Sequence, residues 1–600
     1  MIMMNRVKSG CNSYLYSQTE KNHYQRAVIL THMSTSHSNP MMTVSKNNSQ
    51  LASSNSGILT FTRLLPMIGL LWGFFLLRAH MIDFHMAYFI DELNHVSRAQ
   101  VVWSFSDIQI STTPSKFLLY YYIGLFDLPN YLPGWLARTP VALFAMVGAA
   151  STYTFTRMWF SRAAALTAVI VLAVFPFMIF HERMALTDPL TASIVMLALW
   201  YSLVLARHPS KRGGLILGLM LSFMIAAKIL AVPLLAMPVA VMALFGKKPL
   251  RLNQNLRQQT IGLWKLYGPT LLNAALVVGV IWGIIMGFYF IHGLLYPEES
   301  RPLVDDYLYG LPDSDTVLDG NMTHVEEAFR YLWGPLLTAL SFIGIIVLVW
   351  KRWREAALLV GCILAVWLPL IFVAQRPNSR YLSVVGHLWV ILAVGGMFIL
   401  KDELSRLLKA TPLKLVQWTP VALLGVWVVT FGAPFSYQNV FEPTALKLPE
   451  RETHGYFRNF TGFALRDALE LVETLPPISE GTDQRVVVGI IRSCPFLHYH
   501  MAEDAPIKII CPPEREVRHE VLNAALEQYG AVYMFNEQLP PPRTDLVLHR
   551  ERIAGRAQWL ATYHRPHGGI IVDVYIVYPG QIPVSGVRTT PDDDEIPLVK

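Results

Sequence analysis

Long runs of apolar residues follow one another between residues 58 and 435, separated by polar segments. A helix needs about 20 apolar residues to cross the hydrocarbon core of a bilayer, or somewhat fewer where flanking side chains reach the interface. The pattern therefore predicts about eleven membrane-spanning helices. Their approximate ranges are 58–79, 139–156, 160–180, 188–206, 213–228, 230–246, 268–292, 332–350, 356–374, 381–400 and 418–435.

The basic residues between these runs test the number of spans, because Lys and Arg are enriched in cytoplasmic loops. They fall in alternate loops, on the side of the basic N-terminus, whereas the loops of the other parity are acidic or mixed. This alternation stays in phase if the region 213–245 forms two short helices broken near Lys228 and Pro233, and not one bent helix. The N-terminus is then predicted to be cytoplasmic and the C-terminus to lie outside.

Composition changes at both ends of the apolar region. The first 57 residues are polar and rich in Ser and Asn, which predicts a disordered cytoplasmic tail before a transmembrane domain at 58–437. Residues 438–600 are predicted to form an extracytoplasmic α/β domain, in which Cys494 and Cys511 can form a disulfide. No catalytic motif is found there, so we expect a lid, docking or acceptor-recognition role. The expected elements are a helix near 463–473 and β-rich runs at 485–491, 507–510, 531–535 and 569–578.

The overall composition agrees with a lipid environment. Hydrophobic residues make up 53% of the 600 residues and charged residues only 15%, which is more apolar surface than soluble cores of this length bury. The net charge of +7 comes from short clusters between apolar runs, so no nucleic-acid partner is predicted. The four cysteines lack metal-ligand spacing, so no metal site is expected. The fold class is thus an all-α polytopic membrane protein followed by a soluble α/β domain.

The first outer loop, residues 80–137, is too long for a simple connection. A helix from Asp91 onward would place Asp91, His95 and Arg98 on one face, at i, i+4 and i+7. A carboxylate, an imidazole and a guanidinium would then converge at the membrane surface. That set suits a base for an acceptor proton and cations for a lipid phosphate. Alternatively, Asp91 only stabilises the start of an interfacial helix whose other polar groups are solvated.

Five short motifs follow one another on the predicted outer face. They are Asp91-Glu92 at the head of the loop helix, Arg138-Thr139-Pro140 at the entry to the second span, Glu182-Arg183 with Thr187-Asp188-Pro189 before a later span, the Gly218-to-Lys228 helix, and Arg380-Tyr381 before a late span. In this order they resemble the GT-C glycosyltransferases, in particular the branch of protein O-mannosyltransferases and lipid A aminoarabinose transferases. The likeness covers roughly residues 58–400.

The resemblance implies an inverting transfer of a sugar from a polyprenyl-phosphate carrier to a protein, lipid or glycan acceptor on the outer side of the membrane. Asp91 would be the general base for an acceptor hydroxyl. Cations would stabilise the leaving phosphate without a general acid. No metal and no cofactor are implied, because the lipid-phosphate sugar is itself the donor substrate. The implied substrate-binding residues are Glu92, His95, Arg98, Lys116, Arg138, Arg183, Asp188, Lys228, Arg380 and Tyr381.

Two positions depart from the pattern of the family. Many relatives have Lys-Pro-Pro where this chain has Thr113-Pro114-Ser115-Lys116, so Lys116 stands only near the place of the phosphate-binding lysine. Asn94 stands where the family often has an arginine. Either His95 or Arg98 would then substitute, or the chain binds a different carrier headgroup.

Simpler roles stay open for several of these residues. Lys228 can extend its ammonium from a helix end to the interface, Asp188 can cap the next span, and Arg380 can hold a helix at the interface. A transporter is one alternative function, although the inverted repeats and mid-membrane charges of transporters are not found in the sequence. A non-catalytic envelope protein, with the C-terminal domain as its working part, is the other.

Overall fold

The structure, a computed structural model, describes most of the chain from residue 52 onward. The described residues are 52–82, 86–105, 111, 116–126, 134–250, 255–295, 314–374, 378–407, 415–458, 461–491, 494–501, 505–512, 518–538, 555–569 and 571–580. The predicted tail at 1–57 lies almost entirely outside them, as does the segment 112–115. The chain divides into two units, Met1–Leu65 and Pro66–Lys600, and all helices and strands beyond residue 79 belong to the second.

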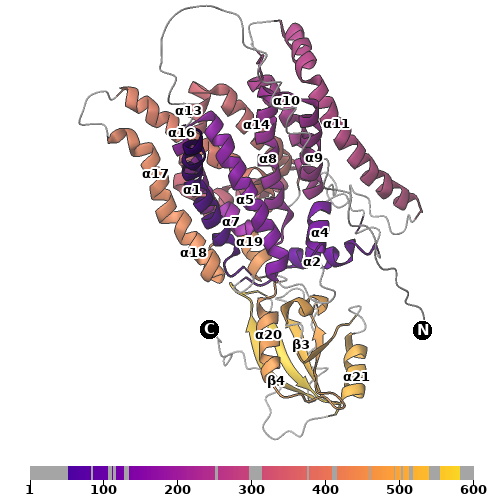
Figure 1. Ribbon diagram of the computed structural model, residues 1–600. Helices are drawn as coiled ribbons and strands as arrows, with labels where there is room; N and C mark the ends of the chain where they lie inside the picture. Colours follow the sequence, from indigo (N-terminus) through magenta and orange to yellow (C-terminus); the bar gives the residue numbers. More distant parts are fainter. Residues whose placement is uncertain are drawn as a thin grey trace, which may run out of the picture. The chain divides into compact units, whose positions relative to one another are not determined.

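Helices form nearly all of the described chain up to residue 458, and every predicted span corresponds to one or more of them (Figure 1). In chain order they are α1 (Ala52–Ala79), α2 (Ile90–Val102), α4 (Phe117–Gly124), α5 (Gly134–Trp159), α6 (Arg162–Ala173), α7 (Pro176–Glu182), α8 (Thr187–Arg207), α9 (Lys211–Ala227), η1 (Ile229–Ala236), α10 (Met237–Phe245), α11 (Leu256–Leu295), α12 (Ser314–Ala328), η2 (Phe329–Trp333), α13 (Gly334–Lys351), α14 (Trp353–Phe372), α15 (Ser379–Leu382), η3 (Ser383–Val385), α16 (Gly386–Leu407), η5 (Val416–Trp418), α17 (Thr419–Trp427), η6 (Val428–Gly432), α18 (Ala433–Phe441), η7 (Pro443–Ala445), α19 (Glu450–Thr453) and η8 (His454–Arg458).

The predicted split of the region 213–245 is present. Helix α9 ends at Ala227, Lys228 has an extended backbone with φ −161° and ψ 127°, and η1 begins at Ile229. Pro233 inside η1 has no N–H to donate, which disfavours one continuous α-helix through this segment. The predicted span 160–180 is instead two helices, α6 and α7, bent by 58°.

Six helical segments of the described chain are long and apolar enough to cross a membrane, or seven if α6 and α7 form one span. Two shorter apolar helices, Leu65–Ala79 and Ile229–Phe245, accompany them. The chain is therefore a multi-pass membrane protein, as predicted. The number of eleven spans stays a prediction.

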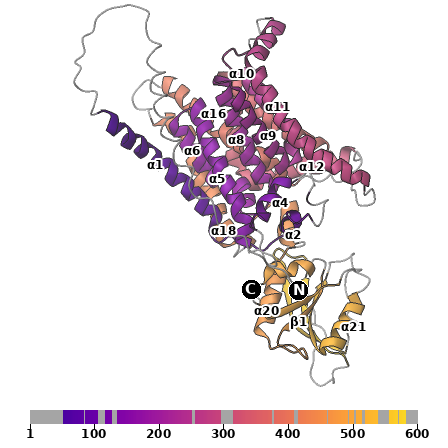
Figure 2. The ribbon, with the colours of Figure 1, turned by 45° about the vertical axis from the view of Figure 1, so that its right-hand side comes forward.

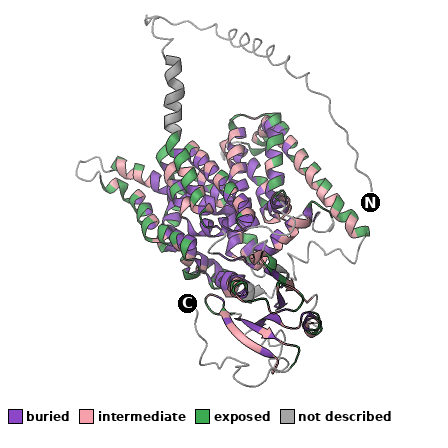
Figure 3. Cartoon of the chain, turned by 60° about the horizontal axis from the view of Figure 1, so that its bottom comes forward, coloured by how far each residue is buried: buried purple, intermediate pink, exposed green. Residues whose placement is uncertain are grey.

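The helices differ in how they are packed (Figure 3). The segment Ser379–Leu407, which contains α16, is apolar and buried along its whole membrane-length window. Only 6% of the equivalent window of α11 is buried, and it exposes large side chains such as Leu276, Ile284 and Phe288. A long apolar helix with exposed large side chains is stable when lipid covers it. We infer that α16 lies at the centre of the helical region and that α11 faces lipid.

The C-terminal part contains a five-stranded sheet, as predicted for an α/β domain. The strands are β1 (Arg485–Ile490), β2 (Ile507–Ile510), β3 (Val532–Gln538), β4 (Ala557–His564) and β5 (Ile571–Val577), in the order β2-β1-β3-β5-β4. The pairs β1–β2 and β1–β3 are parallel, whereas β3–β5 and β4–β5 are antiparallel. Two helices, α20 (Phe463–Thr474) and α21 (Arg518–Tyr529), flank the sheet (Figures 1 and 2).

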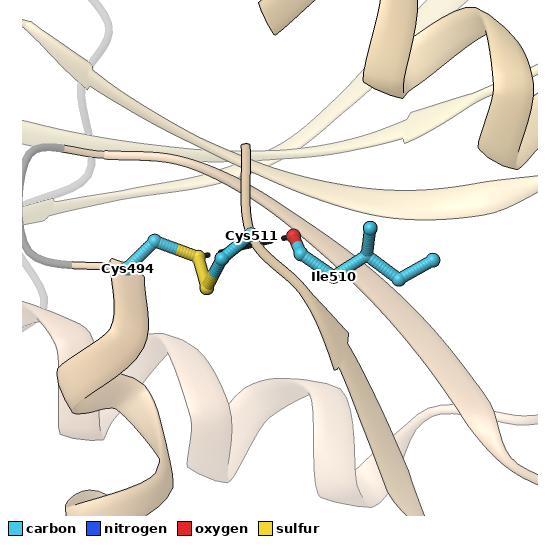
Figure 4. Close-up of a disulfide and its surroundings, with 3 residues drawn as sticks. All are labelled: Cys494, Ile510 and Cys511. Carbon is cyan, nitrogen blue, oxygen red and sulfur yellow. Dashed lines mark hydrogen bonds between the residues drawn. A yellow bond between two sulfur atoms is a disulfide. The ribbon is translucent and has the colours of Figure 1, made fainter. Parts of the chain in front are cut away.

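Alternating side chains of the strands build two small cores, one on each face of the sheet. Val487 and Phe535 pack against α20, whereas Val488 and Met534 pack against α21. Period-two alternation places neighbouring strand residues on opposite faces, so both faces need a helical cover. Cys494 and Cys511 form a disulfide beside this sheet (Figure 4). The sequence left that pairing open.

Candidate active site

Asp91 lies in the first turn of α2, directly after a segment that is held by the C-terminal part of the chain. Phe89, the N-cap residue, has extended backbone and forms an isolated antiparallel bridge with Thr461. The amide of Gly462 donates a hydrogen bond of 2.8 Å to the carbonyl of Tyr88. The start of α2, and with it Asp91, is therefore positioned by residues far along the sequence.

Asp91 begins a chain of four alternating charges. Its Oδ2 lies 2.5 Å from Nη2 of Arg380, and Nε of Arg380 lies 3.8 Å from Oδ2 of Asp188. The ammonium of Lys228 donates a hydrogen bond to the other oxygen of Asp188. Arg380, Asp188 and Lys228 are buried, whereas the side chain of Asp91 is 33% exposed. Asp91 is thus the one accessible residue among these four charges.

Three separate breaks in helices bring these charges together. Arg380 lies in the short helix α15, Asp188 in the first turn of α8, and Lys228 at the break between α9 and η1. The ring of Tyr381 covers the two cations, with its centroid 3.8 Å from Nζ of Lys228 and 5.1 Å from the guanidinium carbon of Arg380. An aromatic face stabilises such cations where water is excluded.

Lys116 adds a third cation to this group. It precedes α4, and its positive φ of 68° is an unusual, strained conformation for a residue other than glycine. Its charge interacts with those of Asp91, Lys228 and Arg380. The structure therefore brings together five of the predicted site residues, namely Asp91, Lys116, Asp188, Lys228 and Arg380, with Tyr381 against them.

The pKa values of Asp91 and Lys116 reflect the charges that lie around them. Burial alone would raise the pKa of Asp91, but Arg380, with His95 and Lys116, outweighs burial and holds the pKa well below its usual range. Burial lowers the pKa of Lys116 to about 8, and the positive charges of Lys228 and Arg380 act in the same direction. In the ligand-free protein Asp91 is ionised and already neutralised by its partner.

Glu92 and Arg138 form a closed pair behind Asp91. Nε and Nη2 of Arg138 each donate a hydrogen bond of 2.8 Å to the carboxylate of Glu92, which also accepts one from the amide of Ala185. Nη1 of Arg138 donates to the carbonyls of Ile82 and Met86. Both side chains are at most 1% exposed. This arrangement favours positioning of the loop over direct contact with a substrate.

The remaining predicted residues also have protein partners. Nδ1 of buried His95 lies 2.8 Å from the carbonyl of Ala185, and Arg98 donates to the hydroxyl of Tyr120 at 3.0 Å. The expected convergence of Asp91, His95 and Arg98 is therefore only partial. Arg183 donates to carbonyls at the end of α1, including that of Arg78 at 2.9 Å.

The structure adds residues that sequence reasoning missed. A cavity of about 110 Å³, here called the Asp91 cavity, is lined by Asp91 and Arg380 and by Glu452, Gly455 and Tyr456 from the segment after the last membrane helix. These last three carry no recognisable motif. Their distance from Asp91 in the sequence leaves no spacing signal that could have found them.

The helical region and the small C-terminal sheet domain have the GT-C fold, as predicted, and the comparisons with known proteins support a membrane glycosyltransferase. Residues 118–263 match the profile of the family described as dolichyl-phosphate-mannose-protein mannosyltransferase. The match includes Arg138, Arg183, Asp188 and Lys228, whereas Asp91 and Arg380 lie outside it. No curated protein shows a significant sequence match to the chain.

The solved structures that resemble the chain include ArnT from Cupriavidus metallidurans. In its apo state ArnT is 13% identical, with a TM-score of 0.52 over 86% of this chain and 98% of that one. ArnT bound to undecaprenyl phosphate gives a TM-score of 0.50 at the same identity and coverage. The oligosaccharyltransferase from Archaeoglobus fulgidus, in complex with zinc and sulfate, is 14% identical, with a TM-score of 0.38 over 78% of this chain and 67% of that one. At this identity the likeness to ArnT establishes a shared fold.

Proposed function

We propose that the protein transfers a sugar from a polyprenyl-phosphate carrier to an acceptor hydroxyl on the extracytoplasmic face of the membrane, with Asp91 as the general base. The observation that carries this proposal is the accessible carboxylate of Asp91 beside the cations Arg380, Lys228 and Lys116. A transfer that expels a phosphate needs both a proton acceptor and a cationic site for the leaving group. The fold shared with ArnT, which binds undecaprenyl phosphate in one of its structures, agrees with this class of donor.

The ion pair of Asp91 with Arg380 suggests how the base becomes available. While Arg380 neutralises the carboxylate, the lowered pKa of Asp91 makes it a weak base. A donor phosphate carries negative charge and competes for the guanidinium, which prefers bidentate binding to such groups. Once Arg380 binds the phosphate, the pKa of Asp91 rises, and the carboxylate can accept the proton of the attacking hydroxyl. As the hydroxyl oxygen bonds to the anomeric carbon, the bond between that carbon and the carrier phosphate breaks. The resulting negative charge stays on a phosphate that already has cationic partners.

The test uses the full chain in proteoliposomes with sugar-labelled donors. Undecaprenyl-phosphate mannose and undecaprenyl-phosphate aminoarabinose are supplied separately, and release of the free carrier phosphate is measured. Asp91→Asn keeps the shape of the side chain but removes the base, so we expect at least a hundredfold slower release. Asp402→Asn is the matched control, since that carboxylate is 63% exposed at the end of α16. Equal rates of release in the two variants would contradict the proposal.

A further inference from the structure

The Asp91 cavity is lined by only one of the three cations described near Asp91. Arg380 lines it together with Asp91 and Glu452, whereas Lys116 and Lys228 do not. A donor phosphate bound mainly by Lys116 and Lys228 would therefore leave this cavity open. Asp91 borders both regions, as a base must when it takes a proton from one substrate during attack on another.

Glu452 is the unusual member of the cavity lining. Its side chain is 1% exposed, and Oε1 accepts a hydrogen bond of 2.6 Å from the amide of Ser379, next to Arg380. Its other oxygen, Oε2, has no hydrogen-bond partner among the described residues. A buried polar atom left without a partner is costly, so a group that enters the cavity is stabilised if it hydrogen-bonds to Oε2.

The chemistry of Glu452 fits a neutral partner. Burial raises the pKa of this carboxyl, although hydrogen bonds with Ser379 and, less strongly, the charge of Arg380 oppose the shift. The unpartnered oxygen Oε2 can accept a hydrogen bond from an alcohol in either protonation state of the carboxyl group. Tyr456 offers an aromatic wall on the same cavity.

The cavity has room for part of a ligand. Its volume of about 110 Å³ exceeds the roughly 10–15 Å³ that one water molecule needs by the same measure. A hydroxyl-bearing group of an acceptor can therefore enter it.

We infer that the Asp91 cavity receives the hydroxyl-bearing group of the acceptor and that Glu452 binds this hydroxyl through Oε2. This inference rests on the proposed function and extends it to the acceptor. The segment after the last membrane helix, through Glu452 and Gly455, then determines which alcohols can reach Asp91. The hydroxyl can belong to a peptide side chain or to a glycan, because both present the same small group.

Gly455 allows the cavity to be filled without disturbing the fold. A Cβ added at this position meets no atom within 4 Å, so a larger side chain enters open space. Gly455→Leu is therefore expected to occupy part of the cavity. Gly425→Leu is the matched control, because Gly425 in α17 likewise has no atom within 4 Å of an added Cβ and does not line the cavity.

The experiment measures sugar transfer from undecaprenyl-phosphate mannose to three acceptor probes, namely 1,2-ethanediol, a threonine peptide and a methyl glycoside. For Gly455→Leu we expect the acceptor KM to rise at least tenfold and the affinity for undecaprenyl phosphate to stay within twofold. Glu452→Gln keeps the bond to Ser379 but changes the group at Oε2, so an increase of up to about tenfold in acceptor KM is expected. Whichever of the peptide and the glycoside responds identifies the source of the hydroxyl.

Three results would overturn the inference. These are an unchanged acceptor KM in Gly455→Leu, a raised donor KM in place of a raised acceptor KM, and no transfer to any of the three probes by the unmodified chain. Failure of the proposed function itself looks different, since Asp91→Asn would then release the carrier as fast as Asp402→Asn. A chain in which Asp91→Asn is inactive but Gly455→Leu is normal retains the function and loses only this assignment of the acceptor site.

Discussion

Two ion pairs that start from neighbouring residues of α2 have very different surroundings. Glu92 and Arg138 are at most 1% exposed, and they form hydrogen bonds with each other and with backbone groups. Asp91, in contrast, is 33% exposed and borders a cavity while paired with Arg380. A buried charge that is paired inside the protein stabilises the fold. A charge that is accessible from a cavity can exchange its partner for a ligand.

The largest expected effect is a difference in stability between variants of the two ion pairs. Glu92→Gln leaves the buried charge of Arg138 without its counter-charge, which we expect to cost about 3–5 kcal/mol of unfolding free energy. Asp91 is 33% exposed and Arg380 keeps Asp188 as a second counter-charge, so Asp91→Asn is expected to cost clearly less than Glu92→Gln. Thermal unfolding of both variants in detergent, followed by size-exclusion chromatography, measures this difference. Equal loss of stability in the two variants would show that the pairs are not distinct.

The next effect concerns Arg380, which belongs to the open pair. Arg380→Lys keeps the positive charge but loses the planar fork that can bind a carboxylate and a phosphate together. Loss of charge-assisted hydrogen bonds worth about 1.5–3 kcal/mol predicts a roughly 10- to 150-fold lower kcat/KM for the donor. Steady-state kinetics with undecaprenyl-phosphate mannose provides the measurement. Arg406→Lys, at a side chain that is 73% exposed, serves as control, and a similar loss there would argue against a specific role.

The smallest effect is a pH dependence. Lys116 is positively charged below its pKa of about 8 and becomes neutral above it. If its ammonium helps to bind the donor phosphate, kcat/KM falls as the pH rises through 8 and is about tenfold lower at pH 9 than at pH 7. Lys116→Arg keeps the charge throughout this range, so its profile is expected to stay flat to higher pH. A fall at the same pH in the arginine variant would assign the titration to another group.

Sequence patterns predicted the local elements well where one physical signal dominated. The break at Lys228 followed from the alternation of loop charges, and the β2 strand Ile507–Ile510 has the predicted bounds. Strand β4 and helix α21 were missed. Among the described strands β4 pairs with β5 alone, and it is mostly half-buried, so its residues do not alternate clearly between apolar and polar. Elements at the edge of a sheet give weaker patterns, because only part of their surface must be apolar.

The candidate site was predictable in its charges and not in its surroundings. Asp91 and Arg380 were found through short motifs, but spacing along α2 also suggested that His95 and Arg98 join them. The carbonyl of Ala185 and the hydroxyl of Tyr120 take those side chains instead, and such tertiary partners leave no periodic trace. Glu452 was missed for the same reason.

The hydroxyl of Tyr499 donates to Oε1 of Gln100 at 2.6 Å, although the two residues are 399 positions apart. At about 5–20 residues per second, a ribosome needs roughly 20–80 s to cover that interval. During this time helix α2 has already been synthesised, but the C-terminal segment that will contact it has not. We therefore expect the candidate site around Asp91 to be assembled late in the synthesis of this protein. A nascent chain that stops before residue 461 has most of its membrane helices and lacks the bridge that fixes Asp91.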